Sequence, residues 1–461
     1  MRATLVLPQP LAEALLAAAR EPLETAGVVI ARVAHLDDGT IRILGHSVHW
    51  VPDMAYRKRG VDHLSIASEG YVPALGKAES LGAAALWFHT HPGNQTAPSP
   101  SEDDAIVDTE IADLFRLRTG SDYYGTLIVS PRESGLAFTA ALHAGSGDSI
   151  AIDRLWIVGD RFRLTAAFDA ASPESSPAYD RNIRAFGGDI QRTLHDLTVG
   201  VVGCGGTGSS VAEQLARLGV RRFKLLDPDT LSDSNITRVY GSAASDVGRP
   251  KVEVLAGHLE HIAPGLRCER VKAMLTTEDA ARRLTGCDVI FGCTDDNAGR
   301  LVLSRIATYF MTPVIDCGVL LGSDENGRLT GIDGRVTVMA PGHACLVCRG
   351  RIDVARAAAE LMTPDERKRR EDEGYAPALG RVEPAVVAFT TAVAAAAVSE
   401  LLERFIGYGP EPRPSEVLLR FHDREISGNI AVPRERHYCH PASGKLGLGV
   451  TKPFLEQAWP E

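Results

Sequence analysis

The first 203 residues contain no cysteine, although eight cysteines lie farther along the 461-residue chain. A secreted disulfide framework is therefore not expected, and a reducing cytoplasm fits the distribution better. Basic residues are not in excess either, because the net charge is -10, which argues against nucleic acid as a general partner.

Long apolar runs are also absent. The most apolar stretch, residues 385–398, falls short of the roughly 20 residues that span a bilayer, so we predict a buried helix and no membrane partner. Pro8, Pro10 and Glu13 interrupt the start of the chain, where a signal peptide needs an unbroken apolar core. A cytoplasmic protein is therefore expected.

The length exceeds what one hydrophobic core supports, so several domains are expected. Up to residue 168 short strands alternate with helices, which predicts an α/β domain, and the small, proline-bearing stretch 169–178 is a predicted linker. Beyond it, "LTVGVVGCGGTG" is a strand running into a glycine turn, followed by the helix "SSVAEQLARLG". This unit predicts a doubly wound, Rossmann-like domain over residues 179–461.

Two histidines close the predicted strand "AAALWFHTH". Because a strand points residues i and i+2 the same way, His89 and His91 aim at one place. Ser101 is a predicted cap for the next helix, which puts Asp104 in its first turn, facing the histidines. Two imidazoles and a carboxylate are three ligands for Zn²⁺, and a fourth position left to water is typical of a hydrolytic site.

His89, His91, Pro92, Ser101 and Asp104 together resemble the JAMM (MPN or JAB) metalloprotease signature, and "PLETAGVVI" resembles its glutamate segment. The similarity covers nearly all of residues 1–168. It implies a JAMM/MPN fold, catalytic zinc on His89, His91 and Asp104, Glu24 as general base, and Ser101 steadying the oxyanion. The gap after His91 is about two residues longer than the commonest family spacing, so Asp103 is the alternative third ligand.

The loop "GCGGTG" places Gly203, Gly205 and Gly208 where missing side chains let backbone amides approach a phosphate. Asp227, after the next strand, suits ribose hydroxyls. A nicotinamide-dependent oxidoreductase would share both features. The residues that follow, Asn235, Arg238 and Lys251, favour a triphosphate, because a nicotinamide enzyme has no evident need for two cations there. Arg238 and Lys251 can neutralise phosphate charge, and Asp295 can hold Mg²⁺.

Six ordered motifs resemble the ThiF-type adenylyltransferases, the family of ubiquitin-activating and molybdopterin-synthase-activating enzymes. They are "YDRNIRAFG", "VGCGGTGS", "LLDPDTLSDSNITR", "GRPK", "CTDDNAGR" and "CLVC". The resemblance implies ATP as cosubstrate and a homodimer in which Arg181 reaches into the partner's site. It also implies nucleotide contacts from Gly203, Gly205, Gly206, Gly208, Asp227, Asp229, Asn235, Arg238 and Lys251, with Asp295 on Mg²⁺.

Cys345 and Cys348 have zinc-knuckle spacing and predict a second, structural zinc. The family often closes such a site with a second Cys-x-x-Cys, but here Cys439 is the third ligand and either His437 or His440 the fourth. Ubiquitin-activating relatives also carry a catalytic cysteine after the knuckle. This chain has none between Cys348 and Cys439, so a thioester step is in doubt.

Together the two predicted sites suggest a bifunctional enzyme. A JAMM domain would trim or remove a ubiquitin-like protein, and the second domain would adenylate its C-terminal glycine carboxylate, which then passes to a conjugating enzyme or a sulfur donor. Three alternatives stay open: a ubiquitin-like sulfur carrier serving cofactor or amino-acid synthesis, an NAD-dependent oxidoreductase, and a binding module with degenerate sites.

Overall fold

The computed structural model describes residues 2–93, 97–133, 135–167, 177–324, 328–362 and 385–459. The chain divides into two compact units. Unit 1 is Met1–Ala171 together with Gly447–Val450, and unit 2 is Ser172–Leu446 together with Thr451–Glu461. The division falls inside the predicted 169–178 linker, of which residues 169–176 lie outside the described residues.

The late segment Gly447–Val450 belongs to unit 1, whereas the sequence prediction placed it in the domain 179–461. Arg32 Nη1 donates a hydrogen bond to the Leu448 carbonyl oxygen at 3.2 Å, and Gly449 lies against Leu44 and Ala34. Packing on strands far away in sequence assigns Gly447–Val450 to unit 1.

Unit 1 is built on a nine-stranded mixed sheet with the strand order β11-β10-β1-β3-β2-β6-β7-β8-β9. Its central strands are rich in Val, Ile and Ala and are buried on both faces, as expected for strands covered from two sides. The strands are β1 (Ala3–Pro8), β2 (Ala26–His35), β3 (Ile41–Trp50), β6 (Ala84–Thr90), β7 (Tyr123–Arg132), β8 (Gly135–Ala144), β9 (Ser149–Ala151), β10 (Arg154–Val158) and β11 (Arg163–Ala166).

Two hydrophobic cores lie on the opposite faces of this sheet. Leu86 and Phe88 of β6 point into the core that includes α1 (Gln9–Ala19). Ala85 and Trp87 point into the core beneath α2 (Val72–Leu81) and α3 (Glu102–Thr119). A separate hairpin of β4 (Tyr56–Arg59) and β5 (Leu64–Ile66) follows β3.

Unit 2 contains an eight-stranded sheet with the order β14-β13-β12-β15-β16-β17-β18-β19. Strands β12 to β16 pair in parallel, and β17 to β19 continue the sheet in antiparallel pairing. The strands are β12 (Thr198–Val202), β13 (Arg222–Leu226), β14 (Arg267–Val271), β15 (Val289–Gly292), β16 (Val314–Ser323), β17 (Leu329–Met339), β18 (Glu416–Arg420) and β19 (Glu425–Asn429).

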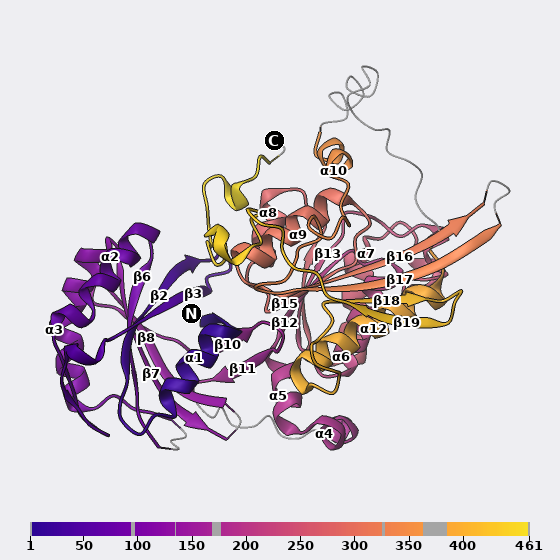
Figure 1. The fold of residues 1–461 in the computed structure, drawn as a ribbon. Coiled ribbons are helices and arrows are strands. Elements are labelled where there is room, and N and C mark those ends of the chain that lie inside the picture. Colours follow the sequence, from indigo (N-terminus) through magenta and orange to yellow (C-terminus); the bar gives the residue numbers. More distant parts are fainter. Residues whose placement is uncertain are drawn as a thin grey trace. The chain divides into compact units, whose positions relative to one another are not determined.

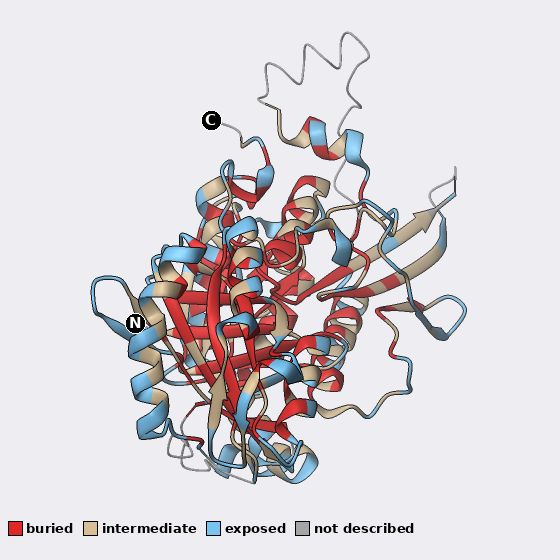
Figure 2. Cartoon of the chain, turned by 60° about the vertical axis from the view of Figure 1, so that its left-hand side comes forward, coloured by how far each residue is buried: buried red, intermediate tan, exposed pale blue. Residues whose placement is uncertain are grey.

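Helices cover both faces of the unit 2 sheet. Figure 1 shows α8 and α9 on one face and α6 and α12 on the other. Figure 2 shows that buried residues are concentrated on strands and exposed residues on helices and loops. The predicted apolar helix near residue 385 is α12. The helices are α4 (Asp180–Phe186), α5 (Gly188–Asp196), α6 (Gly206–Arg217), α7 (Lys251–Ile262), α8 (Glu278–Leu284), α9 (Asn297–Tyr309), α10 (Val354–Glu360) and α12 (Val387–Ile406).

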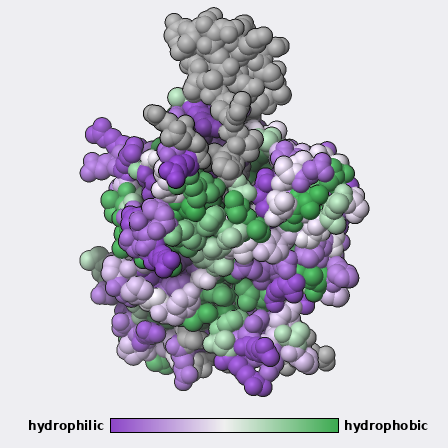
Figure 3. Space-filling view, turned by 90° about the vertical axis from the view of Figure 1, so that its right-hand side faces the viewer, coloured by the Kyte–Doolittle hydropathy of each residue, from purple (hydrophilic) through white to green (hydrophobic). Residues whose placement is uncertain are grey.

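No helix of the described residues has the length and apolarity required to cross a membrane. Figure 3 views the side from which β16 and β17 project in Figure 1, and it shows apolar side chains among hydrophilic ones. Exposed apolar residues of β16, β17 and the edge strand β19 include Leu320, Leu329 and Ile426. This edge of the sheet therefore keeps apolar surface in contact with solvent.

Candidate metal sites and nucleotide loop

The structure brings His89, His91 and Asp104 together in unit 1. Their ligand atoms all lie within 4.8 Å of one another. His89, the penultimate residue of β6, places its Nε2 3.2 Å from His91 Nε2, and Asp104 Oδ1 lies 3.2 Å from His89 Nε2. Two strand-end imidazoles therefore converge with a carboxylate from the first turn of α3.

Glu24 approaches the same cluster from the segment before β2. Its Oε1 lies 3.9 Å from His91 Nε2, and the side chain is buried. Burial raises the pKa of Glu24, although His89 and His91 act against that rise. A carboxylate beside the three ligand atoms, and outside the set of ligands, has the place that a general base requires.

The start of α3 distinguishes the two candidate aspartates. Asp104 N donates to Ser101 Oγ at 3.1 Å, and Ser101 N and Oγ both donate to Asp104 Oδ2, at 2.7 and 2.8 Å. This capping box turns Asp104 toward the histidines, while Asp103 faces His63 at 3.5 Å. Burial acts to raise the pKa of Asp104, but hydrogen bonds with His89 and His91 hold it well below its usual range.

A second cluster in unit 2 contains Cys345, Cys348, His437 and Cys439, again with ligand atoms within 4.8 Å of one another. His437 Nδ1 lies 3.2 Å from Cys439 Sγ and 3.6 Å from Cys345 Sγ. The cluster selects His437 over His440, whose Nδ1 instead accepts a hydrogen bond from the Ala442 N–H at 3.2 Å.

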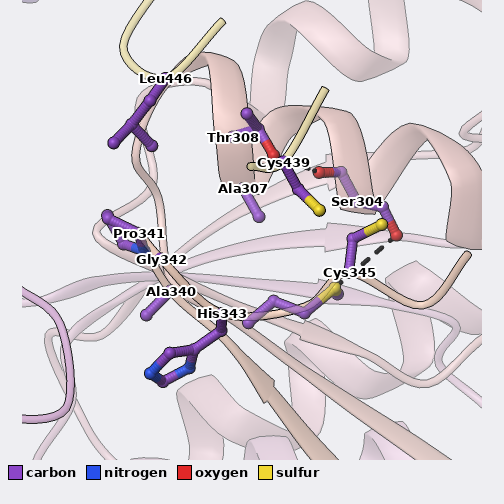
Figure 4. Close-up of a pocket in the computed structure, with 11 residues that line it drawn as sticks. Ser304, Ala307, Thr308, Ala340, Pro341, Gly342, His343, Cys345, Cys439 and Leu446 are labelled. Atoms are coloured by element: carbon purple, nitrogen blue, oxygen red, sulfur yellow. Dashed lines mark hydrogen bonds between the residues drawn. The ribbon is translucent and has the colours of Figure 1, made fainter. Parts of the chain in front are cut away.

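The pKa of Cys345 is lowered to about 5, because the Cys439 thiol donates a hydrogen bond to its sulfur and this outweighs burial. Cys345 and Cys439 also line a small pocket in which their sulfurs lie side by side, while the His343 ring points away (Figure 4). Three sulfurs and one imidazole nitrogen at this spacing suit a structural zinc ion.

The glycine loop of unit 2 connects β12 to α6, and its glycines differ in whether the surroundings leave room for a Cβ atom. Gly203 has φ +87°, and a Cβ atom there would lie 2.6 Å from the Cys293 carbonyl oxygen. A Cβ atom at Gly208 would lie 1.8 Å from the Gly203 carbonyl oxygen, whereas Gly205 faces open space. The loop is therefore closely packed at two glycines, at Gly203 against Cys293 and at Gly208 against the loop itself, and open at Gly205.

Asp227 follows β13 and links the glycine loop to the segment that contains Asp229. Its Oδ2 accepts a hydrogen bond from Cys204 N at 2.7 Å, and its Oδ1 accepts one from Asp229 N at 2.9 Å. Lys251, the first residue of α7, donates to Asp229 Oδ2 at 2.7 Å and lies 3.9 Å from Asp227 Oδ1. Three predicted nucleotide contacts thus form one charged group beside the glycine loop.

The other predicted contacts differ in how they relate to the loop. A Cβ atom at Gly206, the first residue of α6, would lie 3.3 Å from Arg238 Cδ, so the arginine covers the start of this helix. Asn235 is buried and accepts a hydrogen bond from Ser232 N, and Asp295 is exposed after β15. Arg181 is exposed on α4, and within the described part of the chain no hydrogen bond or ion pair connects it to the glycine loop.

The sequence pattern of the ThiF family matches residues 179–440, more than half of the chain. The chain belongs to the ThiF family. The molybdopterin-synthase adenylyltransferase of Escherichia coli K12 is 32% identical over 178 residues, which are 38% of this chain and 68% of that protein. The SAMP-activating enzyme E1 of Haloferax volcanii is 26% identical over 187 residues, 40% of this chain and 64% of that protein.

Two further similarities are to proteins with other names. The tRNA threonylcarbamoyladenosine dehydratase of Bacillus subtilis is 38% identical over 100 residues, 22% of this chain and 39% of that protein. A solved structure of the microcin C7 biosynthetic enzyme MccB with N-formylated MccA covers 58% of this chain and 76% of its own, at 15% identity and a TM-score of 0.46.

The predicted ThiF-type adenylyltransferase domain is thus confirmed for residues 179–440, including its mixed α/β, Rossmann-like sheet. The family match does not extend to residues 1–178, so the JAMM/MPN assignment of unit 1 stays a prediction. The sequence did not indicate two polar residues near Glu24: Arg59, which donates to its carbonyl oxygen, and Thr90, which accepts from Thr25 N. It also did not indicate the buried Asp316, which forms ion pairs with Arg300 and Arg335. For Asp316 the available signal was a carboxylate inside the apolar run "VIDCGV".

We expect Asp104→Asn to lower the zinc content of the protein by about one ion per chain, because it removes one of three ligands. Asp103→Asn is the matched control and should keep the wild-type content, since Asp103 faces His63. Elemental analysis of the purified variants measures both. Zinc loss in the Asp103 variant alone would show that the capping geometry misassigns the ligand.

Two glycine variants should separate folding from nucleotide binding. Gly208→Ala forces a Cβ atom against a backbone oxygen and should lower the free energy of unfolding by about 1–3 kcal/mol. Gly205→Ala meets open space, so stability should change by less than about 0.5 kcal/mol, while ATP affinity should fall at least about tenfold because the methyl group occupies the phosphate approach. Urea unfolding and calorimetric titration test the pair; unchanged ATP binding by the Gly205 variant would place the phosphates elsewhere.

Proposed function

We propose that this protein adenylates the C-terminal carboxylate of a ubiquitin-like protein, and that unit 1 is a zinc peptidase that exposes or releases the same C-terminus. The observation that carries the first activity is the charged group around the glycine loop, where Asp227, Asp229 and Lys251 are held together within a ThiF-family domain. Similarity to a molybdopterin-synthase adenylyltransferase and to a SAMP-activating enzyme supports this substrate class.

In the adenylation step a carboxylate oxygen of the substrate attacks the α-phosphorus of ATP, and the bond to the departing pyrophosphate breaks. The reaction develops negative charge on the phosphates, which Arg238 and Lys251 offset from the two sides of the loop. Asp227 would bind the ribose hydroxyls, and the exposed Asp295 would hold Mg²⁺, which would neutralise phosphate charge. Asn235 is buried, accepts a hydrogen bond from Ser232 N, and would add a phosphate contact.

The residues of unit 1 fit a catalytic zinc ion. Two imidazole nitrogens and one carboxylate oxygen converge within 4.8 Å, and no fourth protein ligand joins them among the described residues. Bound zinc would polarise a scissile carbonyl and lower the pKa of a coordinated water. Glu24 would hold the proton taken from that water and pass it to the leaving amine, and Ser101 keeps Asp104 oriented.

The two activities make chemical sense on one chain. Adenylation requires a free terminal carboxylate, and a peptidase or isopeptidase generates one from a precursor or a conjugate. We further propose that the protein is a homodimer in which the exposed Arg181 reaches the partner's nucleotide site.

A second candidate is activation of a ubiquitin-like sulfur carrier. No cysteine lies between Cys348 and Cys439 to receive an acyl group, and a molybdopterin-synthase adenylyltransferase is among the relatives. The adenylate would then pass to an external sulfur donor and become a thiocarboxylate, which mass spectrometry of the partner detects. A thioester on a separate conjugating protein would instead favour protein modification.

The adenylation proposal predicts pyrophosphate exchange into ATP that depends on a glycine-terminated ubiquitin-like protein. Arg238→Ala and Lys251→Ala should each slow the exchange about 100-fold or more, because each removes a cation from the developing phosphate charge. Arg217→Ala, an exposed arginine at the end of α6, is the matched control. No exchange with any ubiquitin-like protein tested would refute this activity.

The peptidase proposal predicts cleavage of a ubiquitin-like protein that carries residues beyond its terminal glycine. Glu24→Gln should slow cleavage about 100- to 10,000-fold while zinc content stays at the wild-type level, since Glu24 is not among the clustered ligands. Glu21→Gln, on the exposed loop before it, should cleave normally. Gel electrophoresis of the cleavage products measures both rates. Equal cleavage rates for the two variants would show that Glu24 is not the general base.

A further inference from the structure

Two consecutive residues of the β4–β5 hairpin hold the backbone of Glu24 from both sides. The Glu24 N–H donates to the Gly60 carbonyl oxygen at 2.8 Å. Arg59 Nε donates to the Glu24 carbonyl oxygen, also at 2.8 Å. With both backbone groups fixed, the direction in which the Glu24 side chain leaves the backbone is fixed too.

The hairpin continues this grip along the segment that leads into β2. Arg59 Nη2 donates to Thr25 Oγ1 at 2.8 Å, and the Ala26 N–H donates to Tyr56 Oη at 2.9 Å. The guanidinium of Arg59 lies 4.8 Å from the centre of the Tyr56 ring, so the two hairpin side chains support each other. Arg59 therefore uses two nitrogens on two successive residues.

The opposite side of the same segment is tied to the histidine strand. Thr25 N donates to Thr90 Oγ1 at 2.9 Å, and Thr90 N donates to the Thr25 carbonyl oxygen at 3.0 Å. Thr90 lies between His89 and His91 in the sequence. The Glu24 segment is thus clamped between the hairpin and the residues that carry the metal ligands.

Charge pairing does not explain where Arg59 lies. Arg59 Nη1 forms an ion pair with Asp53 Oδ1 at 3.5 Å, but the Asp53 side chain is 96% exposed, so solvent screens the pair. Its short hydrogen bonds all go to the segment that carries Glu24. An arginine used in this way sets a backbone position, because its planar fork holds two acceptors in a fixed relation.

We propose that Arg59 is the positioning residue of the unit 1 site: it acts through the backbone of residues 24 and 25 to keep the Glu24 carboxylate at the His89, His91 and Asp104 cluster. This inference rests on the proposed peptidase function for its catalytic consequence. Its structural part, the dependence of the Glu24 backbone on Arg59, does not.

Peptidase kinetics on the zinc-loaded full-length protein provide the first test. Arg59→Ala should lower kcat about 10- to 100-fold, the cost of a misplaced catalytic group, with KM and zinc content unchanged. Arg59→Lys should restore little of the rate, because one ammonium group cannot span both acceptors. Arg57→Ala, on an exposed residue of the same hairpin, is the matched control and should behave as wild type.

Amide hydrogen exchange of the metal-free protein provides a second test that needs no activity. In Arg59→Ala and Arg59→Lys the amides of residues 24–26 should exchange about three- to tenfold faster than in wild type, the worth of one lost hydrogen bond, whereas Arg57→Ala should leave them unchanged. If the wild-type protein cleaves nothing, the peptidase proposal fails, and the exchange result alone decides the inference. Unchanged exchange in both Arg59 variants, or a raised KM with unchanged kcat, would overturn it.

Discussion

The pairing of β2 with β6 is the interaction on which the unit 1 site depends. Its register sets Ala26 opposite His89, so the residues just before β2 lie against the end of the histidine strand. Two hydrogen bonds between Thr25 and Thr90, the residues that follow Glu24 and precede His91, continue the contact past the last ladder pair. A shift of one residue would turn alternate side chains to the other face, separating the histidines from Asp104 and from Glu24.

Strand pairing has the same role in unit 2, where the pairs are parallel. Strands β12, β13 and β15 end at one edge of the sheet, which brings the glycine loop, Asp227 and Cys293 together from separate parts of the sequence. Ligand sites are expected at this edge in doubly wound sheets. Gly203 and Gly208 are required there because two backbone segments approach too closely for any Cβ atom.

Short-range motifs could be predicted from the sequence because their geometry is local. The strand period aligns His89 with His91, and the capping box selects Asp104 over Asp103. Contacts made by long, flexible side chains could not be predicted in this way. "YRKRG" indicates only a charged turn, and it does not show that Arg59 binds the Glu24 backbone. The sequence likewise does not show that Gly447–Val450 packs in unit 1. The choice of His437 over His440 depends on how residues 434–440 turn, which spacing alone does not fix.

The two sites differ in the sign of the charges that surround them, and this argues against a binding module whose sites are both degenerate. In unit 1 the buried carboxylate of Glu24 and the half-buried Asp104 surround two imidazoles, an arrangement that a divalent cation neutralises. In unit 2 Arg238 and Lys251 flank a loop with an open glycine, an arrangement that suits an anion. Holding the two carboxylates of unit 1 this close costs stability that a bound cation would offset. In unit 2 Lys251 is already paired with Asp229 and Asp227, so it is held beside the open glycine without that cost.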